Sequence, residues 1–175
     1  MRMKAKKSKK GRKPRLEPLA RIRRRLMRLW TEKVHRLHNG KCAICGKVHG
    51  EIDPKTGKPS YMNAHHIEPR ATCAALRYDS MNGILLCPSC HKFGRNSAHK
   101  GSIWFITWLI EHRPDQYEYI MRHRDDIVNI NDREYLAALE ASLKAEPSNR
   151  EKYILCEVGR TCALSIREGE GGGAE

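Results

Sequence analysis

Two cysteine pairs with the same internal spacing are the residues best suited to bind a metal ion. Cys42 and Cys45 form one C-x-x-C pair, Cys87 and Cys90 form the other, and 41 residues separate them. Two thiolates in one tight turn occupy half of a tetrahedral zinc site, and a second pair completes it. A redox-active pair of the thioredoxin type is the alternative, but no βαβ pattern surrounds either pair. We therefore predict one four-cysteine zinc site, which is structural because four thiolates leave no open position for water.

Histidines and an asparagine lie between and directly after the two pairs. His65 and His66 are neighbours, Asn82 precedes the second pair, and His91 follows Cys90. A neutral imidazole has a pKa near ~6.5, so it can accept a proton or bind a divalent metal at neutral pH. On a strand, the two adjacent rings would point to opposite faces. The simpler interpretations are structural histidines, a histidine that binds the zinc, and an Asn-Gly turn without a further role.

The order of these residues resembles the HNH endonuclease family. The matching elements are His-His-x-x-Pro at 65–69, Asn82, and Leu-Cys-x-x-Cys-His at 86–91, and together with the first pair they span about residues 41–99. A second likeness, to phage recombination nucleases of the NinG/Rap kind, rests on His65, Leu76, Arg77, Tyr78, Asp79 and Asn82. The resemblance implies a DNA endonuclease with a ββα-metal (His-Me finger) core.

The resemblance also implies a role for each matched residue. His66 is the general base that takes a proton from the attacking water, and Asn82 orients this base or braces the loop. His65 and His91 hold one divalent ion, and His99 lies where some relatives place a further ligand or a phosphate contact. Mg²⁺ or Mn²⁺ is the expected ion, and histidine ligands also suit Ni²⁺ or Zn²⁺ in vitro. The alternative is a zinc-ribbon protein that binds nucleic acid without catalysis.

The positive charge is concentrated at the N-terminal end of the chain. Residues 1–38 hold 16 of the 34 Lys and Arg residues and two of the 20 Asp and Glu residues, so they account for the whole formal charge of +14. Such a segment indicates a polyanion partner, DNA first, in duplex or branched form; a solvated tail is the alternative. The candidate phosphate contacts are Lys6, Lys7, Lys9, Lys10, Arg12, Lys13, Arg21, Arg24, Arg25, Arg28, Arg70, Arg77, Lys92 and Arg95.

The pattern of apolar residues predicts an α+β fold that is mostly helical, with helices flanking the nuclease core. We expect a disordered basic arm over 1–15, a basic amphipathic helix within 16–40 and the zinc-containing nuclease core over 41–100. A helical segment over 101–147 packs on or beside the core, and its first helix, apolar nearly all round, should be buried. Residues 148–175 form a C-terminal segment whose last ~8 residues are disordered.

The remaining features bear on the compartment and on assembly. No apolar run approaches the ~20 residues of a membrane span, and no secretory signal is recognisable. The chain has seven cysteines, an odd number that argues against a full disulfide framework. Cys73, Cys156 and Cys162 are expected to be ordinary core or surface residues. We therefore predict a cytoplasmic protein of a bacterium or a phage-infected cell, and a homodimer is compatible with the sequence.

Overall fold

The structure is a computed structural model that describes residues 16–54 and 56–145. The predicted basic arm, with its six candidate phosphate contacts from Lys6 to Lys13, lies outside the described residues. The same holds for Cys156, Cys162 and the predicted segment 148–175.

The predicted basic amphipathic helix is present as α1, Leu19–Leu37. It buries an apolar stripe that includes Leu26, Trp30 and Val34, while Arg21, Arg24 and Arg28 lie exposed. Just after the helix ends at Leu37, Asn39 and Gly40 both adopt positive φ angles, of 50° and 67°. These left-handed residues turn the chain into the first cysteine pair.

Two short strands form the only sheet in the described parts of the chain. Strand β1 (Asn63–His66) pairs antiparallel with β2 (Gly83–Leu86), so that His65 faces Ile84 and His66 faces Gly83. The connection between them contains two 3₁₀ turns, η1 (Ala75–Tyr78) and η2 (Ser80–Asn82). A five-residue π-helical turn, η3 (Ser89–Phe93), follows β2.

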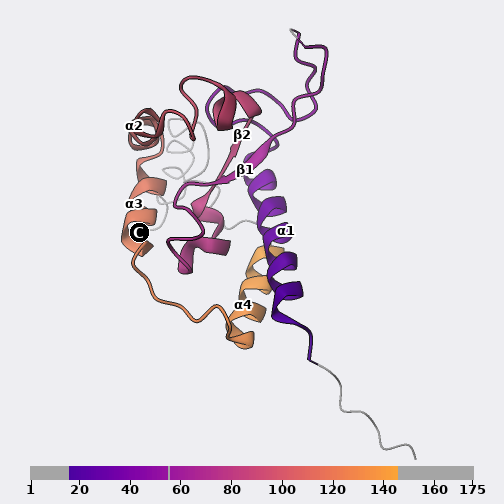
Figure 1. The fold of residues 1–175 in the computed structure, drawn as a ribbon, viewed down its shortest axis with the longest axis vertical. Coiled ribbons are helices and arrows are strands. Elements are labelled where there is room, and N and C mark those ends of the chain that lie inside the picture. The colour runs from indigo at the N-terminus through magenta and orange to yellow at the C-terminus, as the bar shows by residue number, and fades with distance from the viewer. Residues whose placement is uncertain (1–15, 55, 146–175) are drawn as a thin grey trace, which may run out of the picture.

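Three further helices complete the described structure: α2 (Ser102–His112), α3 (Pro114–His123) and α4 (Arg133–Lys144). Helix α4 packs along α1, and α2 and α3 lie on the other side of the sheet (Figure 1). Asp132 caps α4 by accepting hydrogen bonds from the backbone N–H groups of Glu134 and Tyr135.

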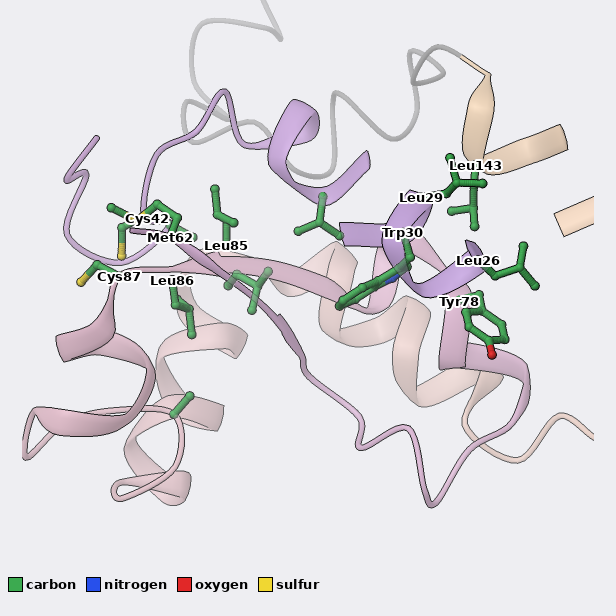
Figure 2. Packing of buried hydrophobic residues seen from close by; sticks show 14 of the residues in the cluster. Leu26, Leu29, Trp30, Cys42, Met62, Tyr78, Leu85, Leu86, Cys87 and Leu143 are labelled. Carbon is green, nitrogen blue, oxygen red and sulfur yellow. The ribbon is translucent and has the colours of Figure 1, made fainter. Parts of the chain in front are cut away.

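One hydrophobic cluster joins α1, the sheet and α4. Leu26, Leu29, Trp30 and Leu143 gather in one part of it, and Cys42 and Cys87 lie together at the opposite end (Figure 2). All four residues of β2 are buried, so this strand runs through the cluster. The first cysteine pair is bound to the strand directly, because the N–H of Ala43 donates to the carbonyl of Leu85 over 2.8 Å.

The expectation that the first helix after residue 100 is a buried core element is wrong. Only Phe105 and Leu109 of α2 are buried, and Ile103 is 84% exposed. The helix is apolar on nearly every side, but only one side meets the core. No helix of the described residues is both long and apolar enough to cross a membrane.

Candidate metal centres

The four cysteines of the two C-x-x-C pairs come together at one end of the sheet. Their sulfur atoms all lie within 4.8 Å of one another, and the sulfurs of Cys45 and Cys87 are 3.6 Å apart. Tetrahedral zinc with Zn–S bonds of ≈ 2.3 Å requires sulfur–sulfur distances of about 3.8 Å. The cluster therefore has the composition and the spacing of a four-cysteine zinc site, as predicted.

Local backbone geometry forms both cysteine turns. Gly46 has a φ of 71°, and its N–H donates to the carbonyl of Cys42 over 2.9 Å, which closes the first turn. In the second turn, the N–H of Cys90 lies 3.5 Å from the sulfur of Cys87. A glycine at position 46 is needed because L-residues with a side chain rarely adopt such a φ.

The electrostatics of the cluster also favour a cation. Hydrogen bonds from the thiols of Cys87 and Cys90 lower the pKa of Cys42, whereas burial raises the pKa of Cys45 to about 11. Contact with Cys42 and Cys87 raises the pKa of Cys90 strongly. Four sulfurs this close cannot all ionise by themselves, and zinc binding supplies the positive charge that makes all four thiolates stable.

Three histidines form a second cluster beside the first. The ring nitrogens of His65, His91 and His99 all lie within 4.8 Å of one another, and the Nε2 atoms of His91 and His99 are 3.1 Å apart. His65 comes from β1 and His91 from η3, whereas His99 comes from the loop before α2. Two ligand nitrogens at ≈ 2.0–2.1 Å from one divalent ion are about 3.0–3.4 Å apart, so the cluster fits such an ion.

The loop after η3 brings His99 back to His91. The N–H of Ala98 donates to the carbonyl of Cys90 over 2.9 Å, and the N–H of His99 donates to the carbonyl of His91 over 3.2 Å. The structure therefore places His99 in the cluster although its spacing from His91 is loose in the sequence.

His65 and His91, the two less exposed histidines of this cluster, favour the neutral state that binds metals. Burial, together with the charges of His91 and His99, lowers the pKa of His65 to about 3. Burial and the charge of His99 lower the pKa of His91 to about 4. Their imidazoles are therefore unprotonated at neutral pH, ready to donate a lone pair to an ion.

His66 lies on the opposite face of β1, away from the three-histidine cluster. Its ring stacks on Trp30, with the ring centres 3.8 Å apart and the planes 13° from parallel. Its Nε2 lies 2.9 Å from the carbonyl oxygen of Arg77. Burial lowers the pKa of His66, the hydrogen bond to Arg77 raises it, and the positive charges of Arg70 and Arg77 lower it. The strand alternation predicted for the two neighbouring histidines is therefore present, without a bulge.

Gly83 faces His66 across the sheet, and its lack of a side chain makes room for α1. A Cβ at this position would lie 2.3 Å from Cγ2 of Val34 and 3.1 Å from Cζ2 of Trp30. The Nε1–H of Trp30 also donates to the carbonyl of Asp79 over 2.8 Å. The tryptophan that stacks on His66 is thus fixed on two sides.

Asn82 is completely buried and braces the connection between the strands. Its Oδ1 accepts from the N–H of Glu68 over 2.7 Å, and its Nδ2 donates to the carbonyls of Glu68 and Leu76. Gln116 of α3 acts on the same segment, because its Nε2 donates to the carbonyls of Met81 and Gly83 over 2.8 and 3.1 Å. Sequence reasoning missed Gln116, since no local pattern links it to residues more than 30 positions away.

The candidate phosphate contacts fall into different surroundings. Arg25 is held by Glu17 and Glu140, with shortest distances of 2.9 and 2.8 Å, and these hydrogen bonds raise its pKa. Arg28 lies 3.7 Å from Glu32. Among the other candidates in the described residues, Arg21, Arg24, Arg70, Lys92 and Arg95 are exposed and Arg77 is half-buried.

Two strands carry neighbouring histidines between two cysteine pairs whose sulfurs could hold one zinc ion. Residues 42–94 match the family model described as HNH endonuclease, so this part of the chain is an HNH endonuclease domain. The predicted family resemblance is thereby confirmed for these residues, whereas the NinG/Rap likeness stays a prediction. Searches of curated proteins and of solved structures found no match.

Proposed function

We propose that this protein is a metal-dependent endodeoxyribonuclease that hydrolyses phosphodiester bonds in DNA. The observation that carries the proposal is the convergence of His65, His91 and His99 within 4.8 Å, at the HNH domain. These residues would hold one divalent ion, Mg²⁺ or Mn²⁺, with Ni²⁺ or Zn²⁺ as substitutes in vitro. When bound, such an ion neutralises charge on the phosphate oxygens and keeps positions open for the substrate.

His66 serves as the general base in this proposal. A carbonyl oxygen only accepts hydrogen bonds, so the contact with Arg77 places the ring proton on Nε2 and leaves the lone pair on Nδ1. The lowered pKa keeps the ring neutral at pH 7, able to take a proton from an attacking water at Nδ1. The same carbonyl stabilises the charged ring after proton transfer, and the stack on Trp30 limits ring rotation.

The other residues of the domain hold this arrangement in place. In this proposal, β1, β2 and the short helical turn η3 act as the ββα-metal core. Asn82 and Gln116 fix the backbone between the two strands, including the end of the loop that contains Arg77. Because Cys90 directly precedes His91, zinc bound to the four cysteines would also restrain one ligand of the catalytic ion.

The substrate is DNA, in duplex or branched form, and the basic N-terminal arm increases affinity for it. The NinG/Rap likeness supports a recombination nuclease of phage type that cuts branched DNA. Comparing cleavage rates on a Holliday junction, a flap and a linear duplex tests this choice: equal rates on all three would contradict the branched-DNA role. The free thiols in the described residues suit action in a reducing cytoplasm.

A plasmid-nicking assay tests the proposed activity most directly. The zinc-loaded full chain should convert supercoiled plasmid to nicked or linear forms with Mg²⁺, Mn²⁺ or Ni²⁺, and EDTA should abolish the conversion. Binding to DNA without cleavage under every metal would instead support the alternative, a non-catalytic zinc-ribbon protein.

A histidine substitution assigns the chemistry. His66→Ala should reduce the cleavage rate at least about 10²–10⁴-fold, the usual contribution of a general base, while zinc content and DNA affinity stay unchanged. His66→Gln retains a donor for the Arg77 carbonyl but cannot accept the proton in the same way, so it should be equally inactive. Undiminished cleavage by both variants would refute the general-base role.

A further inference from the structure

A groove rich in arginine runs between α1 and the connection from β1 to β2. It has a volume of about 580 Å³, and its walls carry Arg23, Arg24, Arg70 and Arg77. Met27, Tyr78 and two alanines supply its apolar lining, and none of the described residues that line it is acidic. The volume lies within the range of clefts that take ligands of nucleotide size. The lining residues come from α1 and from the connection between β1 and β2, two segments that lie close together in Figure 1.

Two of these arginines have positive charges that no carboxylate in the described residues neutralises. Arg24 and Arg70 are exposed, and their guanidinium groups make no hydrogen bond or ion pair within residues 16–54 and 56–145. Arg25, next to Arg24 on α1, instead binds Glu17 and Glu140. The two arginines lie on different sides of α1. On one side the positive charge is paired with carboxylates of the protein, whereas on the groove side it is left for a ligand.

The other two arginines are held in position. Nε and one terminal nitrogen of Arg77 donate to the carbonyl of Arg70 over 3.0 and 2.9 Å. One terminal nitrogen of Arg23 donates to the side chain of Asn131 and lies 3.4 Å from the carbonyl of Ile130. Several positive charges around one open groove repel one another, and this arrangement favours a bound anion.

The groove leads to the nuclease site, because Arg77 belongs to both. Its backbone carbonyl is the hydrogen-bond partner of His66 over 2.9 Å, while its side chain lines the groove. A guanidinium fork matches the oxygen geometry of a phosphodiester, and apolar side chains suit the face of a deoxyribose. These features fit one strand of DNA better than a small inorganic anion.

We infer that this groove is a second phosphate-binding site, in which Arg24 and Arg70 contact the DNA backbone beside the cleaved bond. The inference rests on the proposed nuclease function for its substrate, DNA.

The test compares DNA binding by two charge-matched double variants of the full chain loaded with zinc. Arg24→Gln/Arg70→Gln removes the groove contacts, and Arg122→Gln/Arg124→Gln removes two arginines that are exposed at the end of α3. Affinity for a 20-base-pair duplex is measured over a range of salt concentrations, without a chelator and without added divalent ions other than the bound zinc. We expect the groove variant to lose about tenfold or more in affinity and to reduce the salt slope by about 1 to 2. The control variant should change the affinity and the salt slope by only a fraction of these amounts.

The outcomes separate this inference from the proposed function. Equal behaviour of the two double variants, with a wild type that cleaves DNA, overturns the groove and leaves the nuclease intact. Loss of binding in the groove variant alone supports the groove even if no metal supports cleavage by the wild type. A groove variant that loses affinity for polyglutamate or inorganic phosphate but not for DNA overturns the inference.

Discussion

The two metal centres of this domain are adjacent in the chain but differ in coordination and exposure. Cys90 belongs to one and His91 to the other, yet the first centre has four thiols and the second has three imidazoles. Four sulfurs fill a tetrahedral site, whereas three nitrogens leave positions for water and substrate. Cys42 and Cys87 are buried in the hydrophobic cluster, whereas His99 is exposed. From this comparison we expect the cysteine centre to support folding and the histidine centre to be accessible for chemistry.

Removing a buried cysteine tests this comparison and should have the largest effect on zinc binding and stability. Cys87→Ser removes a ligand that lies in the hydrophobic cluster and anchors the end of β2. We expect loss of bound zinc and destabilisation of at least about 3 kcal/mol, because structural zinc binding contributes directly to folding. Zinc content by mass spectrometry and urea unfolding measure both.

Cys73 provides the matched control for this experiment. It is also buried but lies in a separate small cluster with Leu76 and Ile120. Cys73→Ala should retain a full equivalent of zinc and lose less stability than Cys87→Ser. Retention of zinc and stability by Cys87→Ser would show that the cysteine centre does not support the fold.

Removing a histidine ligand should instead reduce cleavage strongly and change stability little. His91→Ala removes one of three ligands from a half-buried position, so we expect a cleavage rate at least about 10³-fold lower and a stability change within about 1 kcal/mol. His112→Ala, which removes an exposed histidine stacked on Trp108, serves as the control. If His91→Ala loses zinc and unfolds, the two centres are one structural unit and the comparison fails.

Local patterns were enough to predict much of this arrangement. The spacing of Cys42, Cys45, Cys87 and Cys90 predicted one cluster, and strand alternation predicted that His65 and His66 diverge. The apolar pattern predicted the basic helix that α1 forms, because helix periodicity is a local property.

Contacts between distant segments could not be predicted in this way. Glu140 neutralises Arg25 across 115 residues, and Gln116 holds the backbone of Met81 through tertiary packing alone. The exposed side of α2 was mistaken for core because composition reports how apolar a helix is, and not what covers it. The position of His99 depends on backbone bonds in an irregular loop, for which the sequence has no periodic signal.

The smallest expected effect concerns pH, and it sharpens the difference between the two centres. Metal binding requires unprotonated imidazoles, and an ordinary histidine with a pKa near 6.5 is about 90% protonated at pH 5.5. Because the pKa values of His65 and His91 are lowered to about 3 and about 4, both rings stay almost entirely neutral at pH 5.5. The affinity of the zinc-loaded protein for Ni²⁺, measured by calorimetry, should therefore fall far less between pH 7.5 and 5.5 than the roughly thousandfold of three ordinary imidazoles. His65→Ala serves as the comparison variant for the contribution of His65, because the substitution removes one ligand and adds no group that titrates. A thousandfold loss in the wild type would show that the rings titrate normally, and that burial does not prepare this centre for its ion.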